Sequence, residues 1–368
     1  MPPLNLLIKP ASSLCNMRCK YCFYGDVSEM RSIESFGMMS EETLETLVKR
    51  AFEYADGQIG FAFQGGEPTL AGIDFYRKLI DLEKQYNTKN LAVSNSIQTN
   101  GYLIDDEWAE FFAKHGFLVG LSLDGTREAH DSIRIDAKGK GTFDRVCAAA
   151  AVLEKHHVDF NILCVVNNFV ARYPKKVYEN LKKYRYLQFI ACIDPFDKEK
   201  QIYSLKEDRY ANFLKQTFDL YYKDIMSGNY VSIRNFDNYI NILMGKHPES
   251  CAMSGFCTCY GVVEGDGSVY PCDFYVLDQW RLGNINQNSI SDMLSSDIAK
   301  RFVEVSLQTA QACRACRYYP LCRGGCRRDR EPFEGDVPPL NRHCKAYREF
   351  FEYSIDRMLE IAKAFRAD

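Results

Sequence analysis

The first half of the chain alternates short apolar runs with longer stretches in which apolar residues recur at helical spacing. Runs of this length, bounded by polar or glycine-containing segments, predict buried β-strands. Six runs of this kind occur before residue 193, at Leu4–Ile8, Ile59–Phe63, Leu91–Thr99, Phe117–Leu123, Phe160–Val166 and Leu187–Cys192.

The stretches between these runs predict amphipathic helices. In Ser40–Tyr54 the apolar stripe consists of Leu44, Leu47, Val48 and Ala51, and Ser40 is a candidate N-cap. Similar patterns occur at Ile73–Gln85, Asp105–His115 and Thr142–His156.

Alternating strands and helices predict an α/β fold with a parallel sheet, built either as a partial barrel or as a doubly wound sheet. In both architectures, ligands bind at the carboxyl ends of the strands. The distinctive motifs of this chain follow the predicted strands, as Cys15–Cys22, Gly65-Gly66-Glu67-Pro68, Gln98–Gly101 and Ser122–Gly125. The sequence therefore predicts a single site at these strand ends.

The second half of the chain predicts helices at Ser204–Met226 and Phe236–Met244, followed by a cysteine-rich region. Within that region, Glu264–Ser268 separates two short apolar runs and predicts a β-hairpin. A terminal helix is expected over Tyr347–Phe365.

Composition excludes several classes of function. The formal net charge of -3 gives no general electrostatic basis for nucleic-acid binding. No run reaches the roughly 18 apolar residues of a membrane helix, and the N-terminus lacks the features of a signal peptide, so a cytoplasmic protein is expected. The basic cluster Arg327-Arg328-Asp329-Arg330 is interpreted as a solvated surface.

The cysteines carry the strongest chemical signal. The chain has fifteen, of which Cys15, Cys19 and Cys22 form a C-x3-C-x2-C motif and nine others lie between Cys251 and Cys344. Clustered cysteines in a reducing compartment indicate metal ligands rather than disulfides. Three thiolates leave one iron of a [4Fe–4S] cluster open, whereas four close it. Zinc sites are the structural alternative, although no fourth ligand lies near the first motif in the sequence.

The motif Cys15-x3-Cys19-x2-Cys22, with Tyr21 before the last cysteine, resembles the signature of the radical S-adenosylmethionine (SAM) superfamily. Gly65-Gly66-Glu67-Pro68 resembles that superfamily's glycine–glutamate motif. The later cysteines resemble the seven-cysteine pattern of the SPASM subgroup. The runs Ile8–Ser13, Cys19–Tyr24 and Tyr270–Tyr275 are similar to anaerobic sulfatase-maturating enzymes.

This resemblance implies a partial (β/α)6 barrel over residues 1–235, a SPASM domain with a β-hairpin over 236–346 and a C-terminal helix over 347–368. It also implies three [4Fe–4S] clusters and bound SAM. Cys15, Cys19 and Cys22 would hold the SAM cluster. The first auxiliary cluster would bind Cys251, Cys257, Cys272 and Cys326, and the second would bind Cys313, Cys316, Cys322 and Cys344. Cys259 is an alternative to Cys257 as a ligand.

The resemblance further implies the residues that contact SAM. The amino group would lie at Gly65, Gly66 and Glu67, and Ser122 and Arg134 would hold the carboxylate. Backbone near Tyr21, Val165 and Ile193 would receive the adenine. Each position has a structural alternative: a tight turn for the glycines, a surface residue for Arg134, and strand core for Val165 and Ile193.

The implied reaction is oxidation of a cysteine or serine in a sulfatase Cys/Ser-x-Pro-x-Arg segment to Cα-formylglycine. A 5′-deoxyadenosyl radical would take a hydrogen from Cβ, Asp273 would act as base, and an auxiliary cluster would accept an electron. The implied partners are an unfolded or nascent sulfatase as substrate and flavodoxin or ferredoxin as electron donor.

Three other functions remain open from the sequence alone. Another SPASM enzyme would form thioether or carbon–carbon crosslinks in a precursor peptide. A pure electron carrier would have no use for an open cluster or for the glycine–glutamate motif. A zinc-stabilised interaction protein would use the same cysteines without redox chemistry.

Overall fold

The computed structural model describes residues 3–196, 199–331 and 339–367. The chain divides into two compact units, each assembled from separate segments. The first contains residues 1–122, 134–160 and 258–302, and the second contains residues 123–133, 161–257 and 303–368. Both units therefore combine segments from the first half of the chain with segments from the cysteine-rich half.

The first unit is built on a sheet with the order β10-β9-β8-β1-β2-β3-β4. The strands β1 to β4 are parallel and lie in sequence order, and β8 adds to β1 in the parallel direction. The hairpin of β8 and β9 is antiparallel, as is the pair of β9 and β10. The strands are β1 (Leu4–Ile8), β2 (Gln58–Phe63), β3 (Ala92–Thr99), β4 (Leu118–Ser122), β8 (Val262–Val263), β9 (Ser268–Tyr270) and β10 (Gly283–Asn284).

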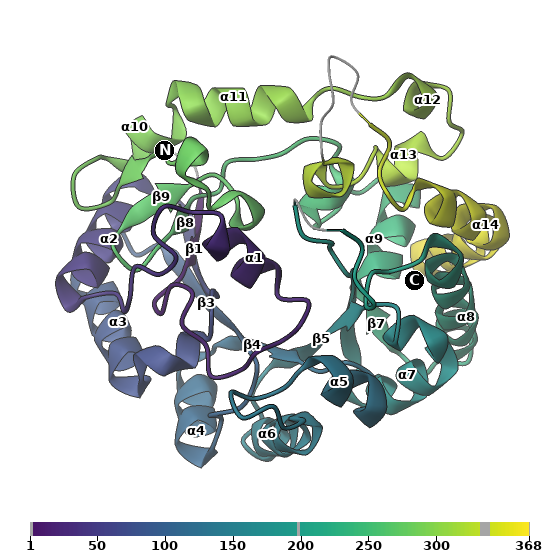
Figure 1. Cartoon of the computed structure of the whole chain (residues 1–368), viewed down its shortest axis with the longest axis horizontal. Helices are drawn as coiled ribbons and strands as arrows, with labels where there is room; N and C mark the ends of the chain where they lie inside the picture. Colours follow the sequence, from purple (N-terminus) through teal and green to yellow (C-terminus); the bar gives the residue numbers. More distant parts are fainter. Residues whose placement is uncertain (1–2, 197–198, 332–338, 368) are drawn as a thin grey trace. The chain divides into compact units, whose positions relative to one another are not determined.

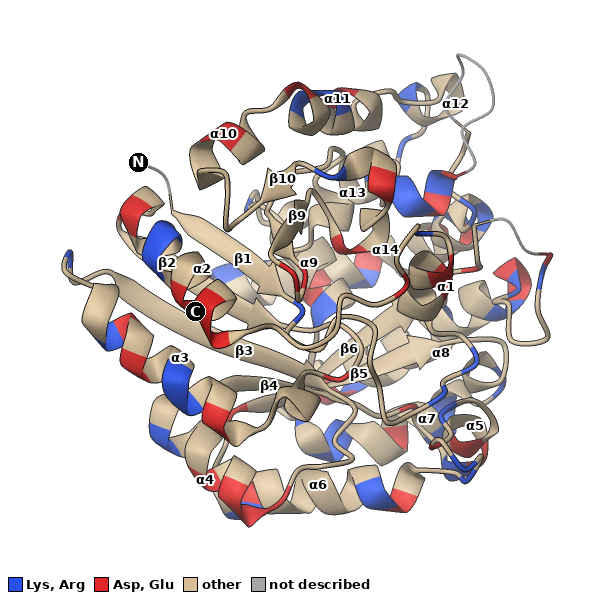
Figure 2. Cartoon of the chain, turned by 60° about the vertical axis from the view of Figure 1, so that its left-hand side comes forward, with Lys and Arg blue, Asp and Glu red and all other residues tan. Residues whose placement is uncertain are grey.

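Helices connect the parallel strands of this unit (Figure 1). They are α1 (Phe23–Glu29), α2 (Glu41–Tyr54), α3 (Ile73–Tyr86) and α4 (Asp106–His115). The unit also contains α6 (Phe143–Lys155), which follows β4, and α10 (Ile290–Leu294), which follows β10. Acidic and basic side chains are interspersed along α3, α4 and α6 (Figure 2). These helices therefore show no extended surface of one charge sign, in agreement with the near-neutral composition.

The second unit contains three parallel strands, β5 (Phe160–Val166), β6 (Tyr186–Ala191) and β7 (Ser232–Ile233), in sequence order. Its core includes aromatic contacts of Phe350 on the terminal helix with Phe218 and Phe236. Its helices are α5 (Arg127–Ile133), α7 (Pro174–Leu181), α8 (Glu207–Met226), α9 (Arg234–Leu243), α12 (Gln311–Arg314), α13 (Tyr319–Cys322) and α14 (Cys344–Ala367).

Helix α11 (Asp297–Ser306) begins in the first unit and ends in the second. The short 3-10 helices are η1 (Pro68–Ala71), η2 (Val170–Arg172), η3 (Lys182–Tyr184), η4 (Cys251–Met253), η5 (Asp273–Tyr275), η6 (Asp278–Trp280) and η7 (Arg327–Arg330). Among the described residues, no helix combines the length and the apolar character needed to cross a membrane.

Sequence order within each set of parallel strands distinguishes the two predicted architectures. A doubly wound sheet reverses its strand order at a switch point, whereas a barrel adds each strand beside the previous one. The runs β1 to β4 and β5 to β7 show no reversal. This order favours the barrel alternative.

The predicted strands agree with the observed ones to within one or two residues, and the predicted hairpin and terminal helix are present. The helices α1, α5, α7 and α11 and the short helices of the cysteine-rich region were not predicted. Except for α11, which has ten residues, these helices have eight residues or fewer, so periodicity carries little signal for them.

The Ser40 N-cap generates a stability prediction. The Ser40 side chain accepts a hydrogen bond from the Thr43 amide at the start of α2. Ser40→Ala is expected to lower the free energy of unfolding by about 1 kcal/mol because that amide loses its partner. Ser40→Asp keeps an acceptor at the cap and is expected to retain native stability. Anaerobic urea unfolding followed by circular dichroism measures both, and equal losses in the two variants would contradict the cap.

Candidate functional site

The C-x3-C-x2-C loop connects β1 to α1 in the first unit. Cys22 is the N-cap of α1, and its sulfur accepts a hydrogen bond from the Gly25 amide at 3.4 Å. The Cys15 sulfur accepts one from the Met17 amide, also at 3.4 Å. Cys19 lies between them and is half-buried. Backbone amides therefore orient two of the three predicted ligand sulfurs.

Burial controls the protonation of Cys15. The pKa of its thiol is raised to about 11, chiefly by burial and to a smaller extent by the nearby Glu67 and Cys22, against the opposing Met17 amide. At neutral pH this thiol is protonated in the metal-free chain. A metal that binds here must displace the proton, so metal binding is coupled to pH.

The Gly65-Gly66-Glu67 segment packs backbone to backbone against the approach to this loop. The Gly66 amide donates to the Ser12 carbonyl at 2.7 Å, and the Glu67 amide donates to the Leu14 carbonyl at 2.8 Å. A Cβ atom on Gly66 would lie 2.0 Å from the Leu14 carbonyl oxygen. Gly65 has φ +136°, a conformation that L side chains rarely adopt. Both glycines are therefore required by the local geometry.

The Glu67 side chain fixes this segment to the end of β3. Its carboxylate is buried and accepts hydrogen bonds from the Thr69 hydroxyl at 2.6 Å, the Thr99 hydroxyl at 2.7 Å and the Asn100 amide at 2.8 Å. Burial raises the pKa of Glu67, and these hydrogen bonds oppose the shift. The Glu67 carboxylate is thus occupied by partners within the protein. If this motif binds SAM, as predicted, the contacts are expected from the backbone of residues 65–67 and not from the Glu67 side chain.

Tyr21 and Arg134 lie together beside the loop. The Arg134 guanidinium is 5.3 Å from the centre of the Tyr21 ring, and both side chains are buried. The Arg18 amide donates to the Ile135 carbonyl at 2.7 Å, which holds the two segments together. Arg134 is therefore a buried cation and not a surface residue. Ser122, its predicted companion, is the last residue of β4 and is also buried.

Asp273 is held by residues at the ends of β1 and β2. It follows the hairpin of β8 and β9, and it forms a buried ion pair with Lys9, the first residue after β1. Gln64, the first residue after β2, donates from Nε2 to Asp273 Oδ2 at 2.7 Å. Lys9 is fully buried, and its Nζ lies 3.6 Å from the centre of the Tyr24 ring. The carboxylate predicted as base is thus fixed at these strand ends.

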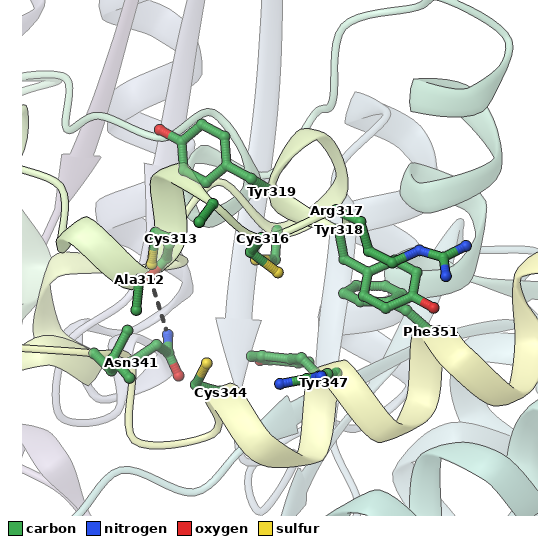
Figure 3. A pocket seen from close by; sticks show the side chains of 15 residues that line it. Ala312, Cys313, Cys316, Arg317, Tyr318, Tyr319, Asn341, Cys344, Tyr347 and Phe351 are labelled. Carbon is green, nitrogen blue, oxygen red and sulfur yellow. Dashed lines mark hydrogen bonds between the residues drawn. The ribbon is translucent and has the colours of Figure 1, made fainter.

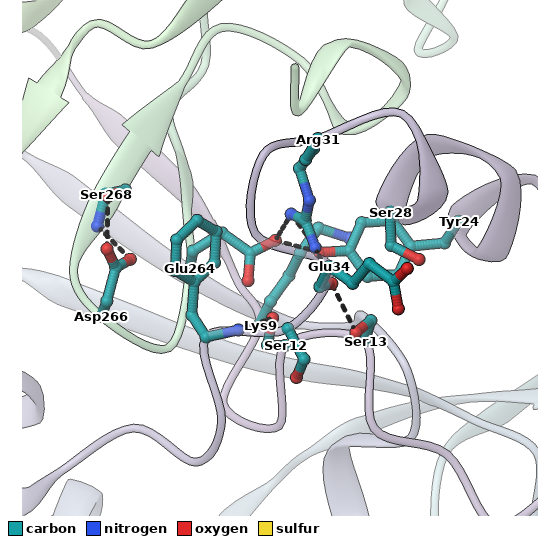
Figure 4. A network of polar contacts seen from close by, with 12 residues as sticks. Lys9, Ser12, Ser13, Tyr24, Ser28, Arg31, Glu34, Glu264, Asp266 and Ser268 are labelled. Atoms are coloured by element: carbon teal, nitrogen blue, oxygen red, sulfur yellow. Dashed lines mark hydrogen bonds and ion pairs between the residues drawn. The ribbon is translucent and has the colours of Figure 1, made fainter. Parts of the chain in front are cut away.

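A second buried ion pair connects α1 to the hairpin (Figure 4). Arg31 Nη1 lies 2.9 Å from Glu264 Oε1, and both side chains are fully buried. The Tyr24 hydroxyl donates to the same oxygen of Glu264. Burial raises the pKa of Tyr24, and the charge of Glu264 raises it further, so the phenol remains protonated and serves as a donor.

Val165 and Ile193, the predicted adenine contacts, belong to the second unit. The Val165 amide donates to Asp124 Oδ1 at 2.9 Å, and Ile193 follows the end of β6. Both are half-buried, so neither is closed into the strand core.

The predicted ligands of the first auxiliary cluster are divided between the units, because Cys272 lies in the first and Cys251, Cys257 and Cys326 lie in the second. Burial raises the pKa of Cys257, and the charge of Cys251 contributes to the same shift. The Cys257 amide donates to the Ser306 hydroxyl at 2.8 Å.

Cys259 has different surroundings from Cys257. It belongs to the first unit, and burial raises its pKa to about 11, against an opposing hydrogen bond from the Gly261 backbone. Cys257 therefore has Cys251 as an electrostatic neighbour, whereas the groups that shift Cys259 include no cysteine.

The four predicted ligands of the second auxiliary cluster line one cavity of about 560 Å³ in the second unit. Figure 3 shows Cys313, Cys316 and Cys344 around this cavity, with Tyr347 and Phe351 beside them. The pKa of Cys322 is raised to about 11, chiefly by burial and to a smaller extent by the charges of the other three cysteines. Their arrangement in a single apolar cavity fits a cluster held by four thiolates.

The interpretation of the basic cluster as a solvated surface is wrong. Arg327, Arg328 and Arg330 are only 6%, 2% and 5% exposed. Arg328 donates to the Asp194 carbonyl at 2.7 Å and lies 3.5 Å from the centre of the Phe196 ring. Arg330 likewise donates to the carbonyls of Gln308 and Ser306, whereas Arg327 pairs with the nearby Glu331. The distant partners of Arg328 and Arg330 are not revealed by a local charge pattern.

Sequence reasoning missed three residues that contact Asp273. They are Lys9, Gln64 and Tyr260, whose hydroxyl oxygen accepts a hydrogen bond from the Asp273 amide at 2.9 Å. Lys9 and Gln64 directly follow apolar strands, and this position was a usable signal, because residues after parallel strands meet at one edge of the sheet. Tyr260 carried no signal, since an isolated tyrosine in an apolar run is ordinarily part of the core.

Comparisons with known proteins define the class. The model of the radical SAM superfamily matches residues 10–181, and the model of an iron–sulfur cluster-binding domain matches residues 251–317. The fold and the site are those of a radical SAM enzyme with a SPASM region.

Full-length relatives define the family. The chain is 49% identical to the cysteine-type anaerobic sulfatase-maturating enzyme of Clostridium novyi, over 99% of this chain and 98% of that protein. It is 32% identical to the serine-type enzyme of Bacteroides thetaiotaomicron, over 95% and 89%. A solved structure of native anSMEcpe with bound AdoMet and Cp18Cys peptide superposes with a TM-score of 0.94, at 49% identity and over 99% and 100% of the two chains.

The chain therefore belongs to the anaerobic sulfatase-maturating enzymes. The expected fold class, enzyme class and activity, which is sulfatase maturation by radical SAM chemistry, are confirmed. The individual site residues remain predictions.

Gly66→Ala is the substitution that tests the close approach at the cluster loop. Its Cβ would overlap the Leu14 carbonyl, so residues 12–14 must shift and the loop with them. We expect loss of SAM binding, measured by equilibrium dialysis on anaerobically reconstituted protein. Gly57→Ala is the control, because a Cβ atom there would meet nothing within 4 Å, so any loss in this variant reflects only the strain of its φ of +74°. Native SAM affinity in Gly66→Ala would contradict the role assigned to this contact.

Proposed function

We propose that this chain oxidises a cysteine, in preference to a serine, in the Cys-x-Pro-x-Arg segment of a sulfatase to Cα-formylglycine. The observation that carries the proposal is Asp273, a buried carboxylate next to Cys272 that Lys9 and Gln64 hold at the strand ends. The preference for cysteine is supported by the higher identity to the cysteine-type relative, 49% against 32%.

The proposed cofactors are SAM and three [4Fe–4S] clusters. Cys15, Cys19 and Cys22 would hold the SAM cluster, and Cys313, Cys316, Cys322 and Cys344 would hold the second auxiliary cluster. The first auxiliary cluster would bind Cys251, Cys257, Cys272 and Cys326. The charge of Cys251 raises the pKa of Cys257, and the charges of Cys313, Cys316 and Cys344 raise that of Cys322. This proximity supports the proposed sets, because a cluster needs its cysteines close together.

Bound SAM and its cluster would supply the radical that removes a hydrogen from Cβ, and an auxiliary cluster would accept the substrate electron. The protein's own groups bind and orient the reactants. The backbone of Gly65 and Gly66 lies beside the three-cysteine loop. We expect polar groups of this backbone to bind the amino group of SAM. The buried Arg134 guanidinium and the buried Ser122 hydroxyl are hydrogen-bond donors, and both would bind the carboxylate of SAM.

Asp273 would receive the thiol proton of the substrate. Loss of the Cβ hydrogen, this proton and one electron would leave a thioaldehyde, which water would hydrolyse to Cα-formylglycine with release of hydrogen sulfide. A base must reach its proton within hydrogen-bond distance, directly or through one water. Lys9 and Gln64 restrain the carboxylate, so its orientation is set before substrate binds. Backbone near Tyr21, Val165 and Ile193 would bind the adenine.

The proposed partners are a nascent or unfolded sulfatase as substrate and a flavodoxin or ferredoxin as electron donor. An unfolded substrate is expected because the modified residue must enter a site at the strand ends in extended form. Solved relatives with bound peptide support a peptide-sized substrate.

Mass spectrometry of a Cys-x-Pro-x-Arg peptide tests the function. The peptide is incubated anaerobically with reconstituted enzyme, SAM and dithionite, beside the matching Ser-x-Pro-x-Arg peptide. Formylglycine from cysteine, faster than from serine and with matching 5′-deoxyadenosine, is expected. Faster conversion of serine would overturn the stated preference.

Asp273→Asn is expected to slow formylglycine formation by about 10²- to 10⁴-fold, since that is the usual contribution of a general base. Release of 5′-deoxyadenosine should continue, because the substitution leaves the SAM site intact. Asp266→Asn in the neighbouring hairpin turn is the control, and it should retain native turnover. Native turnover in Asp273→Asn would remove this residue from the base role.

Iron content separates Cys257 from Cys259. Cys257→Ala is expected to lose about four iron atoms per chain, because one missing ligand opens the first auxiliary cluster. Cys259→Ala should keep the native iron content. The reverse pattern, measured by iron assay after anaerobic reconstitution, would assign the ligand to Cys259.

A further inference from the structure

We propose that the Tyr260 hydroxyl is a positioning group that joins the proposed base to the proposed electron acceptor and raises the reduction potential of the first auxiliary cluster. This inference rests on the proposed function, because it takes Cys272 as a ligand of that cluster. Tyr260 is not among the residues that the family motifs assign.

The contacts of this hydroxyl fix its direction. The Asp273 amide donates to the Tyr260 oxygen at 2.9 Å, and the Tyr260 hydroxyl donates to the Cys272 sulfur at 3.7 Å. Because the amide occupies an acceptor position on the phenol oxygen, the phenol proton is directed towards the sulfur. The Tyr260 amide also donates to the Pro271 carbonyl at 3.3 Å, which ties the two strands of this segment together at the ligand.

The surroundings of this hydrogen bond favour it. Tyr260 and Cys272 are both half-buried, and a hydrogen bond is stronger where the local dielectric is lower than that of bulk water.

Hydrogen bonds to cysteine sulfur are one of the means by which a protein sets the potential of an iron–sulfur cluster. Donation to the Cys272 sulfur withdraws electron density from it and stabilises the reduced state, which carries one more negative charge. The potential therefore rises, and the cluster becomes a better acceptor for the substrate electron.

The same hydroxyl also holds the backbone of Asp273. The side chain that is proposed to take the substrate proton and the sulfur of the proposed electron acceptor are thus fixed by one phenol. Loss of the Tyr260 hydroxyl would change both the reduction potential of the cluster and the orientation of the base. Loss of the hydroxyl from a tyrosine that serves only in packing would change neither.

An EPR-monitored redox titration of the reconstituted holoenzyme tests this role. Tyr260→Phe removes the donor and is expected to shift the midpoint of one auxiliary-cluster signal to a more negative potential. Replacement of Tyr260 by 3-fluorotyrosine keeps the size of the ring and makes the phenol a stronger donor. It is expected to shift the same midpoint in the opposite direction, and it remains informative if Tyr260→Phe does not fold.

Tyr270→Phe is the matched control. Tyr270 is a buried tyrosine of the same hairpin, and its electrostatic neighbours are Glu264 and Arg31 rather than a cysteine. All midpoints should stay at their native values in this variant. A shift in Tyr270→Phe as large as that in Tyr260→Phe would attribute the effect to general loss of packing and overturn the proposal.

Iron analysis of Cys272→Ala distinguishes failure of this inference from failure of the proposed cluster assignment. Loss of one cluster in Cys272→Ala, with unshifted midpoints in both Tyr260 variants, would overturn only the role of Tyr260. Full iron content in Cys272→Ala would remove Cys272 from the ligand set and overturn both. Loss of the cluster together with opposite shifts in the two Tyr260 variants is the expected result.

Discussion

Buried charge has to be compensated where it lies, and this requirement organises the first unit. Lys9, Asp273, Arg31 and Glu264 are all buried, and each is paired with an opposite charge from a distant part of the sequence. Removing one member of such a pair leaves an unpaired buried charge, which costs about 3–5 kcal/mol. The pairs are therefore maintained only when the end of β1, helix α1 and the hairpin of β8 and β9 are in register.

This arrangement connects the two kinds of chemistry that the family requires. Cys22 is the N-cap of helix α1, which carries Tyr24, while the hairpin carries Glu264 and leads to Cys272 and Asp273. The ion pairs thus hold the three-cysteine loop and the segment of the proposed base together within the first unit. Pairing of oppositely charged side chains gives positional specificity here, whereas apolar packing alone would tolerate a shift of register.

The cysteines follow a different physical rule. Burial raises the pKa of the thiols at Cys15 and Cys322 to about 11, so in the metal-free chain they are neutral and apolar. At each of the two proposed cluster sites, thiolates would form once iron supplies the compensating positive charge, so metal binding there is expected to release protons and to depend on pH.

The sequence by itself determined the strands, the longer helices, the Ser40 cap and the three-cysteine motif. These features depend on local periodicity, local hydrogen bonding or short spacing, all of which can be read along the chain. The resemblance of its motifs to a family also identified the activity. Tertiary structure alone decided that Arg327, Arg328 and Arg330 are buried, that Lys9 and Gln64 hold Asp273, and that Tyr260 contacts Cys272. Lys9 and Asp273 are separated by more than 260 residues, and a charge pattern along the chain contains no information about a partner at that distance. The physical reason is that compensation of a buried charge is a property of the packed interior, which exists only once the strands have been brought together.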